Sequence, residues 1–166
     1  LANTYDLYEK QKQHASEQAK TYLPFLRETI EQSDDPFIAT LKTAVVGNVI
    51  DLAAEVSFDL HEAIMSVFHT PFHHDDTQTL RIQLTTAKRV LYIGDNAGEH
   101  IFDALTIESL QNLYPDIDFT YMVRGNPIIN DVTLKEAHEA GIHKICSLMD
   151  SGVPTPGFVY SLASPE

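Results

Sequence analysis

The chain has 166 residues, 43% of them hydrophobic and 21% charged, a composition that is typical of a globular protein and argues against disorder. Its formal net charge of −13 argues against nucleic acids and membranes as partners, because such a surface repels a phosphate backbone and anionic lipids. The same charge disfavours a phosphorylated ligand unless a metal ion or an arginine reverses the sign locally.

The first 86 residues are predicted to be helical. A helix is expected from Thr4 to Thr21, and Pro24 is expected to end it and to begin a second helix, because proline suits a first helical turn. The strongly apolar residues 37–56 predict a buried helix. Further along, we expect an amphipathic helix over 58–68, a solvated loop over 69–76, and a short helix that is capped by Asp76 and ends near Thr85.

The predicted buried helix contains the sequence Gly47-Asn48-Val49-Ile50-Asp51. Glycine inside a helix costs about 1 kcal/mol relative to alanine, and close packing of another element is one reason to keep Gly47 there. Asn48 and Asp51 are three residues apart and share a helical face. They either make a capping or interhelical hydrogen bond or support a functional site.

From residue 87 onward the pattern alternates between strands and helices. Strands are expected at 90–93, 119–123 and 142–148, and helices at 99–114 and 133–140. This order predicts a parallel sheet with right-handed crossovers. We therefore expect an α/β protein with a helical region over residues 1–86 and a Rossmann-like core over residues 87–166.

Polar residues follow each expected strand: Asp95 and Asn96, then Arg124, Asn130 and Asp131, then Ser151. In a parallel sheet these loops share one edge, which is where open α/β sheets bind their ligands. Hard cations such as Mg²⁺ and Mn²⁺ prefer carboxylate, amide and water oxygens. Asp95, Asn96 and Asp131 would supply two carboxylates and an amide, which predicts a metal site.

Other residues at this edge suit a phosphate ester. Arg124 would bind phosphate through two hydrogen bonds, and the backbone N–H of Gly98 would add to anion binding at a helix start. Glu99 is a candidate base or a support for a metal ligand, and Asn130 and Ser151 are candidates for substrate binding. In the alternative interpretation Asp95 caps the next helix and Arg124 only pairs with a carboxylate.

Several other kinds of site are argued against by the motifs. The sequence GDNAGE lacks the G-x-G-x-x-G spacing of dinucleotide-binding loops, and no P-loop occurs. Neither a Ser-His-Asp order nor a G-x-S-x-G elbow is present. A methyltransferase that uses S-adenosylmethionine is an alternative of the same fold class, although the missing glycine-rich loop argues against it. A non-catalytic metal-binding or regulatory module is the other alternative.

Two motifs resemble the damage-control metabolite phosphatases, formerly a domain of unknown function (number 89). They are GDNAGE with Phe102-Asp103 after it, and VRGNPIINDVT. The helical stretch DPFIATLKTAVVGNVIDLAAEV is similar to the segment that precedes the first motif in the stand-alone prokaryotic members. The likeness runs from about Tyr22 to Gly157.

This resemblance implies a three-layer α/β/α sandwich of Rossmann-like fold with an added helical region. It also implies a divalent metal (Mn²⁺, Mg²⁺, Co²⁺ or Ni²⁺) on Asp95, Asn96 and Asp131, and hydrolysis of phosphorylated metabolites, including sugar phosphates. We therefore expect a metal-dependent phosphomonoester hydrolase with these three residues as its catalytic centre. Its nucleophile is either a water molecule or Asp95.

The single cysteine, Cys146, excludes an internal disulfide and a cysteine zinc cage, and a cytoplasmic location is the corresponding expectation. No apolar run approaches the roughly 20 residues that span a bilayer. The chain begins at Leu1 rather than methionine and contains no match to the lysine-bearing KGQ-like motif of the family. We therefore expect a fragment that lacks the C-terminal part of the family domain.

Overall fold

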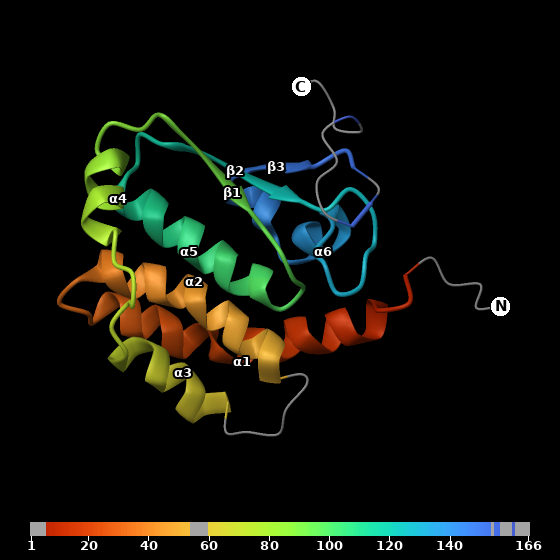
Figure 1. Cartoon of the computed structure of the whole chain (residues 1–166), viewed down its shortest axis with the longest axis horizontal. Helices are drawn as coiled ribbons and strands as arrows, with labels where there is room; N and C mark the ends of the chain where they lie inside the picture. Colours follow the sequence, from red (N-terminus) through yellow and green to blue (C-terminus); the bar gives the residue numbers. More distant parts are fainter. Residues whose placement is uncertain (1–5, 54–59, 154, 157–160, 162–166) are drawn as a thin grey trace.

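A layer of helices packs against a small parallel sheet (Figure 1). The computed structural model describes residues 6–53, 60–153, 155–156 and 161, with only the backbone described for residues 50–53. The elements in chain order are α1 Glu9–Glu31, α2 Pro36–Ala53, α3 Leu60–His69, α4 Thr77–Leu84, β1 Arg89–Ile93, α5 Glu99–Leu113, β2 Asp118–Val123, α6 Leu134–Glu139, the 3₁₀ helix η1 Ile142–Lys144, and β3 Ser147–Asp150.

The sheet has the order β1-β2-β3, and both strand pairs are parallel. Tyr92 of β1 lies opposite Tyr121 of β2, which in turn lies opposite Leu148 of β3. Along the chain, α5 connects β1 to β2, and α6 followed by η1 connects β2 to β3. The predicted α/β class with a parallel sheet is confirmed. In this strand order, two right-handed crossovers place both helices on one face of the sheet.

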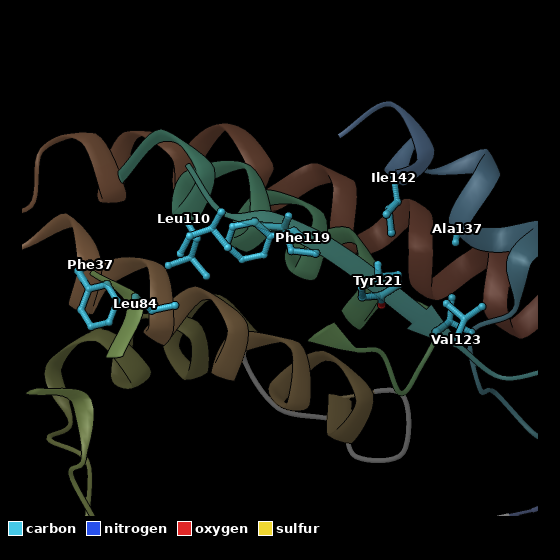
Figure 2. Packing of buried hydrophobic residues seen from close by; sticks show 11 residues of the cluster. Phe37, Leu84, Leu110, Phe119, Tyr121, Val123, Ala137 and Ile142 are labelled. Carbon is cyan, nitrogen blue, oxygen red and sulfur yellow. The ribbon is translucent and has the colours of Figure 1, made fainter. Parts of the chain in front are cut away.

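The inward side chains of β2 form the centre of the main core. Phe119, Tyr121 and Val123 point toward the helices, because alternate residues of a strand share a face. Figure 2 shows them in a row with Leu110 of α5 on one side and Ala137 and Ile142 on the other. This cluster anchors the strand end from which the turn after β2 begins.

A second cluster joins the helical region to α5. Its buried members include Ala19, Leu26 and Ile30 of α1, Val46 of α2, Ile64 of α3, and Phe102 and Leu105 of α5. Helix α5 is therefore buried against the sheet on one side and against α1 and α2 on the other. The expected boundary between residues 86 and 87 falls between α4 and β1, and the division into two domains stays a prediction.

The opposite face of the sheet carries apolar residues that are exposed. Leu91, Ile93 and Met149 belong to this face, and Met122 lies between the last two in the register. Within the described residues, α5 and α6 both pack on the other face, so the second helical layer expected for a sandwich is not among them. No helix in the described ranges is both long and apolar enough to cross a membrane.

Three local predictions were wrong, two about where elements begin or end and one about a helix cap. Pro24 lies inside the continuous helix α1, because burial of Ala19, Leu26 and Ile30 against the neighbouring helices outweighs the cost of proline. The segment expected as a strand from Ile142 begins as η1, and only Ser147–Asp150 pairs with β2.

At the start of α4 the cap differs from the prediction as well. Asp76 makes no side-chain capping bond, whereas Asp75 Oδ1 accepts hydrogen bonds from the N–H and the hydroxyl of Thr77, at 2.9 and 2.6 Å. The predicted element ends at Thr4, Val56 and Phe58 lie outside the described residues.

Candidate functional site

The turns that follow β1 and β2 are joined directly by their backbones. The N–H of Val132 donates to the carbonyl of Asp95 at 2.8 Å, and the N–H of Ala97 donates to the carbonyl of Asn130 at 2.8 Å. Between these two bonds, Asn96 and Asp131 form an antiparallel bridge. Asp95-Asn96 and Asn130-Asp131, far apart in sequence, therefore lie side by side at the carboxyl edge of the sheet.

Arg124 forms an ion pair with Asp131. Its Nε donates to Asp131 Oδ2 at 2.7 Å, and both side chains are partly buried. The backbone of Arg124 is also fixed, since its N–H donates to the carbonyl of Val132 at 3.0 Å. The guanidinium therefore sits at the same edge as the predicted ligands and holds one carboxylate oxygen of Asp131.

The turn that carries Asn130 and Asp131 contains an unusual backbone conformation. Ile129 has a φ of 46°, in the left-handed region that β-branched residues rarely adopt. The N–H of Asp131 donates to the carbonyl of Ile128 at 2.9 Å and closes this turn. Strain of this kind costs on the order of 1–3 kcal/mol and persists only where the surroundings determine the conformation, as the bonds to the first turn do here.

Glu99 at the start of α5 is buried between the first turn and α2. Its Oε2 accepts a hydrogen bond from the N–H of Asn96 at 3.4 Å. A Cβ atom added at Gly47 would lie 2.4 Å from Glu99 Cγ. The close packing that we expected at Gly47 is therefore made by Glu99, and the glycine lets α2 approach the turn.

The N–H of Gly98 is used within the chain. It donates to Nδ1 of His100 at 3.0 Å, which argues against the anion-binding role predicted for this donor. Burial lowers the pKa of His100 to about 4, so the ring is neutral at physiological pH and its Nδ1 can accept this bond. Gly98 itself has a φ of 100°, a conformation that glycine adopts without strain.

A cavity of about 290 Å³ lies between α2 and the first turn. Asn48, Asp95, Glu99 and Asp103 contribute to its lining, so Asn48 faces the side of the site that Asp95 borders. The side chain of Asp51 lies outside the described residues.

Ser151 follows β3 at the neighbouring strand end. Its N–H donates to the carbonyl of Val123 at 2.9 Å, and its Oγ accepts from the N–H of Val153 at 3.4 Å. This places Ser151 next to the end of β2. The substrate-binding role expected of Ser151, like that of Asn130, stays a prediction.

Three further residues were not predicted as part of the site. Asp103 of α5 accepts hydrogen bonds from the hydroxyls of Tyr92 and Tyr121, at 2.6 and 2.7 Å. Burial raises the pKa of Asp103 to about 6, the two tyrosine bonds lower it, and the charge of Asp95 raises it. A partial signal was present in the sequence: Asp103 is four residues after Glu99, so both lie on one face of α5.

The donor atoms of the site suit a hard cation. Asp95 and Asp131 offer carboxylate oxygens and Asn96 an amide oxygen, which are the ligand types that Mg²⁺ and Mn²⁺ prefer. The backbone bridge places Asn96 opposite Asp131, and the ion pair with Arg124 uses Oδ2 of Asp131. In the described part of the chain, no cluster of three or more His, Cys, Asp or Glu side chains is arranged for a metal.

Comparison with known proteins gives consistent results. The damage-control phosphatase ARMT1-like domain matches residues 1–166. The chain is 33% identical over 131 residues to the damage-control phosphatase PH1575 of Pyrococcus horikoshii, covering 78% of this chain and 45% of that protein. It is 31% identical over 159 residues to a damage-control phosphatase of Archaeoglobus fulgidus, covering 93% of this chain and 54% of that protein.

The fold is similar to that of a solved structure as well. The crystal structure of the DUF89 family protein PH1575 from Pyrococcus horikoshii superposes with a TM-score of 0.82 at 27% sequence identity. The match covers 98% of this chain and 56% of that one. The chain thus spans about half the length of the relatives that it matches.

Proposed function

The chain belongs to the damage-control phosphatase ARMT1-like domain family, and from this premise we propose that the protein hydrolyses phosphorylated metabolites, such as sugar phosphates, with the help of a divalent metal. The reaction would take place at the sheet edge where the turns after β1 and β2 meet. This proposal covers the whole protein, of which the chain supplies the part that contains Asp95, Asn96 and Asp131.

One observation carries the proposal. The backbone hydrogen bonds between the two turns bring Asp95-Asn96 and Asn130-Asp131 together. This cluster of oxygen ligands lies in a protein that is acidic as a whole. With a net charge of −13, the protein needs a local positive charge to accept a phosphate ester. Oxygen ligands for a cation and the guanidinium of Arg124 meet that need at one place.

Asp95, Asn96 and Asp131 are the residues that would hold the metal. A divalent cation held there would supply charge neutralisation and Lewis-acid polarisation of the phosphate ester. Arg124 fixes Asp131 through its Nε and adds positive charge next to the phosphate. Glu99 restrains the backbone N–H of Asn96, and in this arrangement it acts on the shape of the turn.

The test is phosphatase activity of the full-length protein. p-Nitrophenyl phosphate and a panel of sugar phosphates would be assayed with Mn²⁺, Co²⁺, Ni²⁺ or Mg²⁺ and after metal removal. We expect turnover that depends on the metal and a loss of at least about 100-fold in Asp95→Asn and in Asp131→Asn, since charge stabilisation is the main catalytic contribution in phosphoryl transfer. Asp116→Asn, at an exposed turn, is the matched control and should retain full activity.

Two outcomes would contradict the proposal. Full metal-stimulated activity in both site variants would place the reaction elsewhere. Metal binding without turnover of any phosphate ester by the intact protein would instead support a non-catalytic metal-binding module.

A further inference from the structure

Asp103 is a buried carboxylate that accepts hydrogen bonds from two tyrosine hydroxyls. Asp103 is 6% exposed. Its Oδ1 accepts a hydrogen bond from the hydroxyl of Tyr92, and its Oδ2 accepts one from the hydroxyl of Tyr121. Burying a carboxylate costs free energy that hydroxyl donors only partly offset. Apolar residues in place of all three side chains would fill the same space without this cost, so the geometry that Asp103 imposes on the two tyrosines is the feature to explain.

The two tyrosines come from neighbouring strands and lie at the same level of the sheet. Tyr92 and Tyr121 are paired in the β1–β2 register, and their ring centroids are 5.7 Å apart. Through its two oxygens, Asp103 therefore ties α5 to both strands. The linkage lies two residues before Gly94, where β1 gives way to the turn that carries Asp95.

The hydroxyl of Tyr121 lies directly against the backbone of Gly94. A Cβ atom added at Gly94 would be 2.1 Å from the Tyr121 hydroxyl oxygen and 2.4 Å from Cζ. Only glycine permits this approach. The N–H of Gly94 also donates to the carbonyl of Met122 at 2.9 Å, so the residue before Asp95 is held by a strand neighbour and by a tyrosine hydroxyl that Asp103 fixes.

We propose that Tyr121, with its hydroxyl held by Asp103, is a positioning residue that supports Gly94 and thereby sets the position of Asp95 for the cation and the phosphate. Tyr92 completes the hydrogen bonds of Asp103, whereas the three atoms nearest to a Cβ placed at Gly94 all belong to Tyr121. The inference rests on the proposed function, because it assigns Tyr121 a role toward the metal site. Asp103 and Tyr92 border the cavity next to Asp95, so Tyr121 is connected to that cavity through Asp103.

Tyr92→Phe and Tyr121→Phe form a matched pair for the test. Each removes one hydroxyl and one hydrogen bond of nearly equal length to Asp103, so both should lower the melting temperature by similar amounts. Only Tyr121→Phe removes a hydroxyl that lies against Gly94, while the ring carbons Cζ and Cε1 keep their contact with it. Residues that orient metal ligands typically change metal affinity about 10- to 100-fold when mutated. We expect Mn²⁺ affinity to fall at least about 10-fold in Tyr121→Phe and less than about 3-fold in Tyr92→Phe.

The experiment is a titration of the full-length protein with Mn²⁺ alone, in which electron paramagnetic resonance measures the concentration of the free ion. In a second measurement, kcat and KM are determined at saturating Mn²⁺. Asp95→Asn is the reference for loss of a ligand. We expect Tyr121→Phe to recover most of its kcat when Mn²⁺ is raised, since it keeps the ligands themselves. A purely structural role would lower the melting temperature of both tyrosine variants and leave the Mn²⁺ affinity of the folded protein unchanged.

The outcomes separate the two proposals. If wild-type protein neither binds Mn²⁺ nor turns over a phosphate ester, the proposed function fails. If the wild type binds Mn²⁺, Asp95→Asn does not, and Tyr121→Phe matches Tyr92→Phe, the positioning role fails while the function stands. Should Tyr121→Phe not fold, Asp103→Asn replaces it; a Mn²⁺ affinity equal to that of wild type in this variant would overturn the inference, and a loss of at least about 3-fold would support it.

Discussion

The two faces of the sheet are both apolar and yet differ in what covers them. On the inner face Phe119 and Tyr121 are 2% and 0% exposed, whereas on the outer face Leu91 and Ile93 are 52% and 69% exposed. Parallel sheets are usually buried on both sides. The difference arises from topology, because the strand order β1-β2-β3 with right-handed crossovers places α5 and α6 together on the inner face.

The comparison also separates two kinds of task. The inner face holds the side chains that support the site, with Tyr92, Tyr121 and Asp103 beneath the first turn. The outer face has apolar residues in register across the three strands, Ile93 with Met122 and Met149. The relatives that the chain matches are about twice its length.

The side chains of the inner face are buried and those of the outer face are exposed. Substitutions on the two faces should therefore have very different effects.

The largest difference is expected between Phe119→Ala and Ile93→Ala. Truncation of a buried phenylalanine costs about 3–5 kcal/mol, and a substitution at an exposed position usually changes stability by less than about 0.5 kcal/mol. Urea unfolding of this chain, followed by circular dichroism, measures both free energies. A loss of several kcal/mol in Ile93→Ala would show that the outer face is packed, and would remove the contrast between the faces.

A pH effect is expected from the inner face. The pKa of Asp103 is raised to about 6 by burial, so the native state binds a proton more tightly than the unfolded chain does. Its contribution to stability is therefore full below the unfolded pKa and is lost as the pH rises through about 6. A shift of two pKa units corresponds to about 3 kcal/mol.

Asp103→Asn tests this effect, because the amide does not titrate. The free energy of unfolding, measured from pH 4 to pH 7, should fall less steeply in Asp103→Asn than in wild type. Asp116→Asn, at the exposed turn after α5, should keep the wild-type slope. Equal slopes in wild type and Asp103→Asn would mean that Asp103 is not protonated in the native state over this range.

A smaller effect is expected where α2 meets the first turn. Gly47→Ala would place a methyl group 2.4 Å from Glu99 Cγ, and overpacking of this kind costs about 1–3 kcal/mol. In the Glu99→Ala background the contacts with Cγ and Cδ are removed and only the one with Cβ at 3.3 Å remains, so the same change should cost much less. A double-mutant cycle by thermal unfolding measures this difference, and additivity of the two changes would exclude the contact.

The smallest effect on stability is expected for Ile93→Thr. The change keeps a β-branched residue in β1, and at an exposed position it should alter the free energy of unfolding by less than about 0.5 kcal/mol. It should nevertheless reduce self-association of this chain, measured by sedimentation velocity, because it interrupts an exposed apolar surface. Unchanged association would show that this surface does not mediate it, and Leu80→Thr on α4 is a control away from the sheet.

Local pattern predicted the order of strands and helices from residue 87 onward, because period and chain topology decide them. It also predicted that Asp95-Asn96 and Asn130-Asp131 share an edge. It failed at Pro24, where packing around α1 outweighs the cost of proline, and at Ile142, where pairing with β2 begins only at Ser147.

The support beneath the first turn was not predicted. Tyr92, Tyr121 and Asp103 meet only when the β1–β2 register and the position of α5 are both known. A sequence pattern gives the residue types and not the strand register. A hydrogen-bond network of this kind can therefore be identified only once the fold is known. The metal and substrate roles of the predicted site residues rest on the proposed experiments.

The backbone bonds between the two turns also bear on how the protein folds. The amides of Val132 and Ala97 each bind a carbonyl from the other turn, so neither is protected until both β-α units have formed and docked. Pairings between distant parts of a chain form late, because their loop-closure entropy must be overcome first. Amide hydrogen exchange at Ala97 and Val132 would therefore report the joint opening of both units, which makes assembly of the site and completion of this part of the fold one cooperative event.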